Sequence, residues 1–173
     1  QSEEYMEHLY ATVVKSVKDA VESMEAGNLY YGSVDVSEYI RDKRDPQVID
    51  PNINRFRFVP LNDSSKETWL INLAIHTVGM GAAGTTVTGD YPYYMEKYIN
   101  ENTNANFIMI QGAELAITSN YGDTLEVDEE LTAQYGERYA KLAAFGKRLG
   151  EKACSIQDSA QVEPILNYAS KTI

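Results

Sequence analysis

The hydrophobic positions of the chain follow two periods, and each period predicts a different kind of element. From Glu3 to Ala26 apolar residues recur every three or four positions, which is the spacing of an amphipathic helix. A strand is predicted from Leu29 to Val36. Arg55 to Val59 alternates with a period of two, so one face of this second strand is apolar and the other carries cations. The charged segment between them, Glu38 to Pro51, contains two prolines and is expected to be a long loop.

The middle of the chain predicts a βαβ unit. Trp69 to His76 is predicted to be a strand, because every second residue from Trp69 to Ile75 is large and apolar. Asn106 to Gln111 is a short apolar run of the kind that suits a strand buried on both faces. Asp90 can cap a helix between them. Because a crossover helix makes two strands parallel, His76 and the segment from Gln111 to Asn120 are expected at the same edge of the sheet.

A last helical stripe runs from about Asp128 to Ile156. The predicted fold class is therefore α/β, a mixed β-sheet covered by α-helices. Its strands lie at Leu29, Arg55, Trp69 and Asn106, and its helices start at the N-terminus, at Asp90 and at about Asp128. The length of 173 residues fits a single domain, residues 1–173. The chain begins with Gln1 rather than Met, so it is expected to be processed or an excerpt of a larger domain.

Composition narrows the classes of function. Hydrophobic residues make up 43% of the chain and no apolar run approaches the roughly 20 residues that span a bilayer, so no transmembrane segment is expected. The net charge of −11 argues against nucleic acid as a partner, because binding to phosphates needs clustered Lys and Arg. The single cysteine, Cys154, excludes an intramolecular disulfide and a cysteine-cluster metal site.

The segment Gly79 to Gly84 reads G-x-G-x-x-G, the pattern of a dinucleotide-binding turn. That function requires the third glycine to open a helix. Gly84 is instead followed by Thr85 to Thr88, a largely β-branched stretch that is poor for opening a helix. We therefore predict an irregular loop that binds no nucleotide. A nucleotide-dependent oxidoreductase has only this turn in its favour.

His76 is the stronger chemical candidate, because ligands collect beyond the carboxyl ends of strands in open α/β sheets. Its imidazole could bind a metal or move protons near pH 7. The alternative is a buried histidine bonded to a backbone carbonyl. Asp90 is most simply a helix cap, and Arg41 either belongs to a solvated loop or forks onto an anionic or carbonyl oxygen. His8 is expected at the surface of the first helix.

The order of three motifs resembles the neutral/alkaline (non-lysosomal) ceramidase family, in the central part of its catalytic domain. The family's A-x-H-P/T-T, S/G-D-Y-P-G-Y and Q-G-x-A-G-D-V-S-P-N motifs correspond here to Ala74 to Thr77, Thr88 to Tyr94 and Gln111 to Asn120. An R-x-x-x-D-P…R-F pattern corresponds to Arg41 through Phe58. The resemblance implies a secreted or cell-surface zinc amidase that releases fatty acid from a lipid-like small molecule, an N-acylated sphingoid base. The sequence leaves the oligomeric state open.

The resemblance also implies roles for individual residues. His76 matches a zinc ligand, Thr118 falls where the family has a serine sometimes assigned as nucleophile, and Arg41 corresponds to an arginine near the active site. Asp90 matches the acid of the D-Y-P turn, with a structural role. The glycine and aspartate that precede the family's serine are replaced by Leu115 and Ala116. The family's other zinc ligands, a histidine upstream and a glutamate and a tyrosine far downstream, lie outside this chain.

Two functions therefore remain open at this point. The first is a zinc-dependent amidohydrolase domain in which His76 is one metal ligand, with zinc present in the intact protein and possibly absent from this chain. Catalytic zinc needs three protein ligands and an open position, so the isolated chain is expected to be inactive. The second is a non-catalytic domain of the same fold that binds a ligand or supports neighbouring domains.

Overall fold

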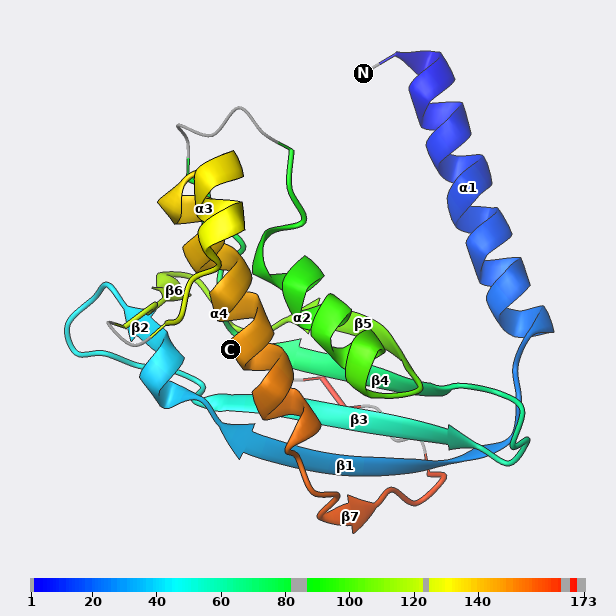
Figure 1. Ribbon diagram of the computed structural model, residues 1–173. Coiled ribbons are helices and arrows are strands. Elements are labelled where there is room, and N and C mark those ends of the chain that lie inside the picture. The colour runs from blue at the N-terminus through cyan, green and yellow to red at the C-terminus, as the bar shows by residue number, and fades with distance from the viewer. Residues whose placement is uncertain (1, 82–86, 123–124, 166–168, 171–173) are drawn as a thin grey trace.

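The computed structural model describes residues 2–81, 87–122, 125–165 and 169–170, and a five-stranded sheet with helices on one face forms its centre (Figure 1). The strands are β1 (Gly27–Asp35), β2 (Ile40–Asp42), β3 (Asn52–Pro60), β4 (Glu67–Leu73), β5 (Ala105–Gln111), β6 (Ile117–Ser119) and β7 (Ala160–Gln161). The helices are α1 (Glu3–Glu22), α2 (Asp90–Asn102), α3 (Glu129–Tyr135) and α4 (Glu137–Cys154), with a 3-10 turn η1 (Ser37–Tyr39). Among these residues no helix is both long and apolar enough to cross a membrane.

The main sheet has the strand order β5-β4-β3-β1-β7, and it is mixed as predicted. β4 and β5 are parallel, with Glu67 opposite Ala105 and Leu73 opposite Gln111, whereas the other neighbours are antiparallel. α2 is the crossover between the two parallel strands, so the predicted βαβ unit is confirmed. β2 and β6 form a separate two-stranded antiparallel ribbon.

The core lies between the sheet and the two long helices α2 and α4, which lie on the same face of the sheet in Figure 1. Alternate residues of β4 enter this core: Trp69, Ile71 and Leu73 are buried. β5 was predicted to be buried on both faces, and this is wrong. Ile108 and Ile110 are 49% and 50% exposed, because no described helix covers the opposite face of the sheet at this edge.

Two further predictions differ from the structure. The segment from Glu38 to Pro51, predicted to be a loop, contains the strand β2, which pairs with β6. The alternate residues of β2, Ile40 and Asp42, are buried. The single helix predicted from about Asp128 to Ile156 is two helices. They are separated at Gly136, whose φ of 87° lies in the left-handed region that favours glycine and ends a helix.

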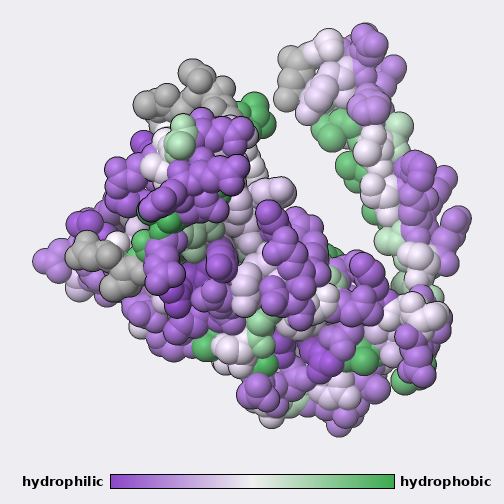
Figure 2. All heavy atoms as spheres, viewed as in Figure 1, coloured by the Kyte–Doolittle hydropathy of each residue, from purple (hydrophilic) through white to green (hydrophobic). Residues whose placement is uncertain are grey.

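The N-terminal helix α1 was predicted to cover the sheet, and this is also wrong. The helix forms, and Ser2 caps it by accepting a hydrogen bond from the backbone N–H of Tyr5. However, none of the residues of α1, all of which the structure describes, is buried. It stands away from the other elements (Figure 1), and its apolar residues, including Leu9, Val13 and Val17, remain exposed (Figure 2).

This exposure predicts a small effect of removing α1. We expect deletion of residues 1–22 to change the free energy of unfolding of the rest of the chain by less than about 1 kcal/mol, because little buried apolar area is lost. Urea unfolding followed by the fluorescence of Trp69, which is buried in the core, measures this. The matched control is Leu149→Ala, a core truncation expected to cost about 2–5 kcal/mol. A loss on deletion as large as that of the control would contradict the prediction.

Candidate functional site

The carboxyl ends of β4 and β5 meet at one edge of the sheet, because the two strands are parallel. The backbone N–H of Gly112, just after β5, donates to the carbonyl of Leu73 at 2.9 Å. The backbone N–H of His76 donates to the carbonyl of Ile117 at 3.3 Å. The predicted proximity of His76 and the Gln111 to Asn120 segment is therefore confirmed.

Both nitrogens of the His76 ring face oxygen atoms of this segment. Nε2 lies 2.9 Å from the carbonyl oxygen of Leu115, and Nδ1 lies 3.1 Å from Oε1 of Glu114. The side chains of His76 and Glu114 are 35% and 24% exposed, so the pair sits at the rim of the fold. The ring contacts a backbone carbonyl, as the simpler sequence interpretation expected, although it is half-buried rather than buried.

Glu114 belongs to a polar network that extends below the histidine. With the amide of Gln111 oriented so that its nitrogen meets acceptors, that nitrogen donates to Glu114 Oε2 at 2.6 Å and to the carbonyl of Ile75 at 3.0 Å. The buried Tyr91 hydroxyl donates to the same carbonyl at 2.7 Å. Burial raises the pKa of Tyr91 far above its ordinary value, so it stays a neutral donor.

Arg41 and Thr118 lie opposite one another in the ribbon of β2 and β6. Their neighbours in the strands, Ile40, Asp42 and Ile117, are buried, so Arg41 and Thr118 occupy the outer face of this ribbon. Arg41 is exposed and Thr118 is half-buried. The ring nitrogens of His76 are directed to Leu115 and Glu114 rather than to the Thr118 hydroxyl. His76 therefore does not act as a base for Thr118 in this arrangement.

Asp90 ties the glycine turn to α2. Its Oδ2 accepts from the backbone N–H of Gly79 and its Oδ1 from that of Tyr91, each at 2.8 Å. The residue is 6% exposed and its φ is 55°, an uncommon conformation in which aspartate is one of the tolerated residues. Asp90 is the first residue of α2 rather than its N-cap, which is Gly89. The structural role implied by the resemblance agrees with these contacts.

The same contacts bear on the glycine pattern. α2 begins at Asp90 and not at Gly84, and the N–H of Gly79 already binds a carboxylate. The helix is thus too far along the chain for the geometry of a dinucleotide-binding turn. Residues 82–86 lie outside the described part of the chain, so the predicted irregular loop is described only at its ends.

The described residues supply few ligands for a zinc ion. Among them, no group of three or more His, Cys, Asp or Glu side chains is arranged to hold a metal. His76 and Glu114 are adjacent, but a catalytic zinc site needs three protein ligands. The residues described do not fit zinc by themselves, and the role of His76 as a metal ligand stays a prediction.

Glu114 is the site residue that sequence reasoning missed, although the segment that begins at Gln111 was predicted to lie at this edge. The family motif has alanine at the position of Glu114, so the resemblance directed attention away from it. The available signal was a Gln-x-x-Glu pair that begins at the end of one strand, while a histidine follows the end of the parallel strand beside it. Strand ends of this kind bring polar side chains together.

An α/β fold with a polar edge at the ends of two parallel strands therefore defines the class of this protein. No known family model matches the chain, and no curated protein matches it in sequence. Its fold is similar to part of the neutral ceramidase of Pseudomonas aeruginosa, with a TM-score of 0.69 and 18% identity over 87% of this chain and 26% of that one. It is also similar to a ceramidase complexed with C2, with a TM-score of 0.61 and 18% identity over 80% of this chain and 23% of that one.

The chain spans about a quarter of the length of these two structures. At this identity the similarity concerns the fold. The fold is therefore ceramidase-like.

Proposed function

We propose that this chain is part of a ceramidase-like hydrolase domain that cleaves the amide bond of an N-acyl sphingoid or related lipid with the help of zinc. The observation that carries the proposal is the position of His76. It lies just after β4, at the carboxyl edge of the sheet, in a fold similar to part of a neutral ceramidase over 87% of this chain. A secreted or cell-surface location follows from the same resemblance and is part of the proposal.

The residues of this edge have separate tasks under the proposal. His76 offers an imidazole nitrogen, and the exposed guanidinium of Arg41 can fork onto a carbonyl or anionic oxygen of a substrate. Thr118 lies opposite Arg41, but the ring nitrogens of His76 contact Leu115 and Glu114, so this ring does not activate the Thr118 hydroxyl. Too few metal ligands lie among the described residues for catalysis, so the chain alone is expected to be inactive.

A non-catalytic domain of the same fold is the second candidate, and a specific observation favours it. Both ring nitrogens of His76 are already engaged within the chain. In addition, Leu115 and Ala116 replace the family's glycine and aspartate. Such a domain binds a lipid-like ligand or supports its neighbours.

The zinc content and the activity of the isolated chain can be measured on the purified protein. We expect it to fold, to contain substoichiometric zinc by elemental analysis, and to leave a fluorescent ceramide uncleaved, because a lone imidazole is a weak zinc site. His76→Ala should change neither result, and His8→Ala, at the exposed second histidine, is the matched control. Stoichiometric zinc that is lost in His76→Ala alone, or zinc-dependent turnover, would contradict this expectation.

The full-length gene product distinguishes a hydrolase from a non-catalytic domain. If it is a ceramidase-like hydrolase, it should cleave the fluorescent ceramide, and His76→Ala should abolish the cleavage while His8→Ala leaves it unchanged. A full-length product that binds the lipid without cleaving it supports the non-catalytic function instead.

A further inference from the structure

We propose that the outer face of the main sheet, the face away from α2 and α4, is covered in the full-length gene product by an apolar layer from outside residues 1–173. The starting observation is a row of apolar side chains that crosses four strands. Tyr31 lies opposite Phe56. Phe56 lies opposite Leu70, which in turn lies opposite Ile108. Residues opposite one another share a face of the sheet, so these side chains form a continuous apolar band.

The rows on either side of this band carry no charge. They consist of Leu29, Phe58, Thr68 and Asn106 on one side, and of Ser33, Asn54, Asn72 and Ile110 on the other. Charged residues make up 24% of the chain, and in β3 and β4 they all alternate onto the opposite face, as Arg55, Arg57 and Glu67. A sheet face in water normally carries polar and charged side chains, so this composition is that of a buried face.

Two polar contacts of the outer face are made within the face itself. The Tyr31 hydroxyl donates to Oδ1 of Asn54 at 2.8 Å. The side-chain amide of Asn72 donates to the carbonyl of Ile110 at 3.3 Å. Unpaired polar groups are what normally makes burial of a polar side chain costly. Because these groups are already paired, an apolar layer can cover them without supplying hydrogen bonds.

The edge of this face at β5 is nevertheless open to solvent. Phe56, Ile108 and Ile110 are 37%, 49% and 50% exposed. α2 and α4 both lie on the opposite face, so neither shields these side chains (Figure 1). Contiguous exposed apolar side chains of this kind mark a contact surface.

α1 does not supply the covering layer, although it has an apolar stripe of its own. Its connector to β1 is held at the turn between β3 and β4. There the carbonyl of Ala26 accepts from the backbone N–H of Leu61 at 2.9 Å. The carboxylate of Glu25 accepts from the Ser65 hydroxyl at 2.8 Å. α1 stands away from the sheet beyond this anchored connector, and none of its residues is buried.

A segment of the same polypeptide fits the outer face better than a second copy of residues 1–173 does. Each copy has a net charge of −11, so two copies repel one another. The two ceramidase structures of similar fold extend well beyond the part that this chain matches, which is 26% and 23% of their lengths. A longer protein of this fold has enough chain to form another layer.

The inference rests on the part of the proposed function that makes this chain a piece of a larger domain. It does not depend on zinc or on amide cleavage, and it is measured without a substrate. A non-catalytic domain would cover the outer face equally well. Failure of this inference is therefore distinguishable from failure of the hydrolase proposal.

The experiment compares the reaction of an introduced cysteine with a maleimide in the isolated chain and in the full-length gene product. Ile108→Cys places the thiol on the outer face, and mass spectrometry of the peptide with residue 108 follows its labelling. We expect labelling to be about 100-fold slower in the full-length product, because a thiol in a packed layer reacts only when that layer opens. Ile110→Cys, at a position 50% exposed in the isolated chain, repeats the test and keeps it decisive if the first variant fails to fold.

Lys97→Cys is the matched control, because Lys97 is 56% exposed on α2, which covers the other face of the sheet. It should be labelled at a similar rate in both proteins. Labelling of Ile108→Cys and Ile110→Cys that is as fast in the full-length product as in the isolated chain would overturn the proposal. Protection that is already present in the isolated chain and disappears on dilution would also overturn it, because a second copy would then cover the outer face.

Discussion

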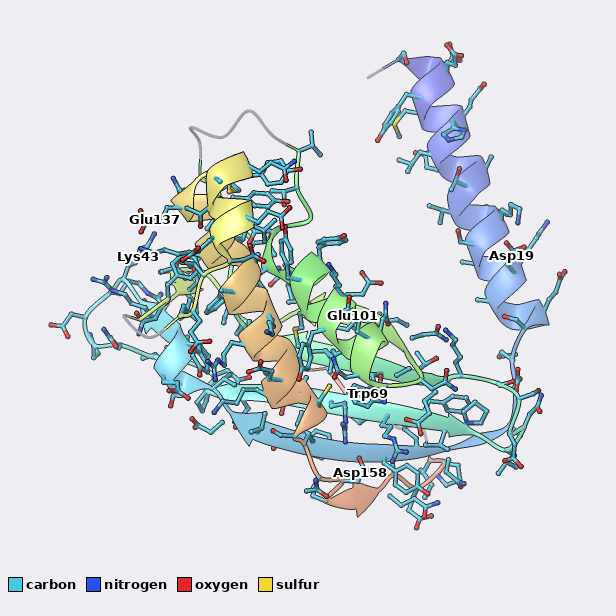
Figure 3. The ribbon with its side chains drawn as sticks, viewed as in Figure 1. Asp19, Lys43, Trp69, Glu101, Glu137 and Asp158 are labelled. Carbon is cyan, nitrogen blue, oxygen red and sulfur yellow. The ribbon has the colours of Figure 1, made fainter. Side chains whose placement is uncertain are left out.

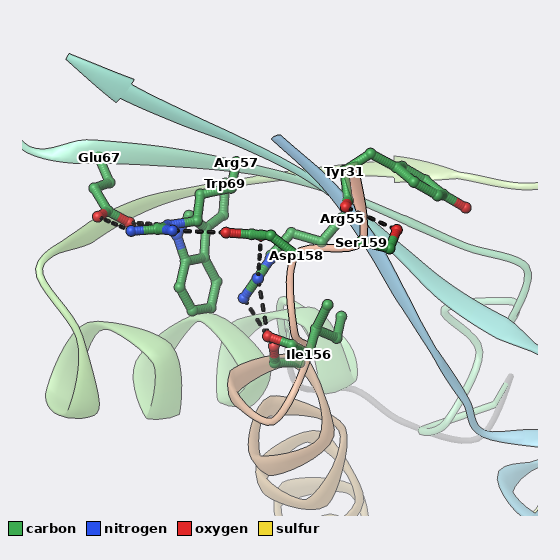
Figure 4. A network of polar contacts seen from close by, with 9 residues as sticks. Tyr31, Arg55, Arg57, Glu67, Trp69, Ile156, Asp158 and Ser159 are labelled. Carbon is green, nitrogen blue, oxygen red and sulfur yellow. Dashed lines mark hydrogen bonds and ion pairs between the residues drawn. The ribbon is translucent and has the colours of Figure 1, made fainter. Parts of the chain in front are cut away.

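Replacing Arg55 by alanine is expected to destabilise the fold by about 4 kcal/mol, because its buried guanidinium connects β3 to the segment after α4. Arg55 is 4% exposed and lies in the middle of β3. Its Nη2 donates to the carbonyl of Ile156 at 3.0 Å and to Asp158 at 2.8 Å. The guanidinium also lies 4.4 Å from the centre of the Trp69 ring, a cation–π contact (Figure 4).

The network extends to the next cation of the strand. Arg57 binds Asp158 at 2.8 Å and forms a two-pronged contact with Glu67, which lowers the pKa of that carboxyl. Figure 3 shows Asp158 next to β7, with Trp69 above it in this view. The two arginines thus fasten the chain after α4 to the sheet, and β7 follows directly.

The measurement is urea unfolding of Arg55→Ala at neutral pH. Arg148→Ala is the control, because it removes a 42% exposed arginine whose ion pair with Glu151 is 3.5 Å long. Exposed pairs contribute about 0–1 kcal/mol, so the control should stay near the unaltered chain. Equal effects of the two variants would show that Arg55 is not a buried connector.

The arginines show where sequence reasoning reaches its limit. The period of two in β3 was predicted, and the alternation of cationic and apolar residues is confirmed. Periodicity does not say which face of the strand is buried. In the structure the face with Arg55 points to the helices, whereas Phe56, on the other face, is 37% exposed. The partners that make this possible, Ile156 and Asp158, lie about a hundred residues further along the chain.

The same distinction holds for the helices. An apolar stripe predicts that a helix forms, and α1, α2 and α4 do form. It does not name the surface that covers the stripe, so α1 was wrongly placed on the sheet. The break at Gly136 depends on the left-handed backbone of this one residue. The apolar stripe continues on both sides of it, so the stripe alone does not predict the break.

The candidate site was predictable in position and not in detail. Parallel strands end at one edge, so His76 and the segment after Gln111 could be placed together from sequence. Their contacts depend on the path of the loop at Gly112. A Cβ atom there would lie 3.0 Å from the Cβ of Ala74, so the backbones approach closely. Such a path, and with it the meeting of Glu114 and His76, is set by packing that no local pattern records.

Gly146 occupies a second close approach, between the two helices that cover the sheet. It is buried in α4, and a Cβ atom at this position would lie 2.4 Å from the carbonyl oxygen of Tyr91 and 2.6 Å from the Cβ of Tyr94. The first of these neighbours is backbone of α2, which a rotamer change cannot move. Gly150, one turn later, meets Tyr98 in the same way at 2.8 Å. The two glycines let α2 and α4 pack backbone against backbone.

We therefore expect Gly146→Ala to destabilise the chain by about 2–3 kcal/mol, because α2 must shift to admit the methyl group. The sign is informative, since glycine to alanine in an exposed helix stabilises by about 1 kcal/mol. For a chain of this size the melting temperature should fall by roughly 5–10 °C. Lys147→Ala, at the exposed next position, is the control and should change stability by less than about 0.5 kcal/mol. The hydroxyl of Tyr91 also donates to the carbonyl of Ile75, the residue before His76. The nitrogen-15 NMR signals of the His76 ring should therefore shift in Gly146→Ala and stay unchanged in Lys147→Ala. An unchanged or raised melting temperature would contradict the prediction, because it would mean that a methyl group fits between α2 and α4 at this position.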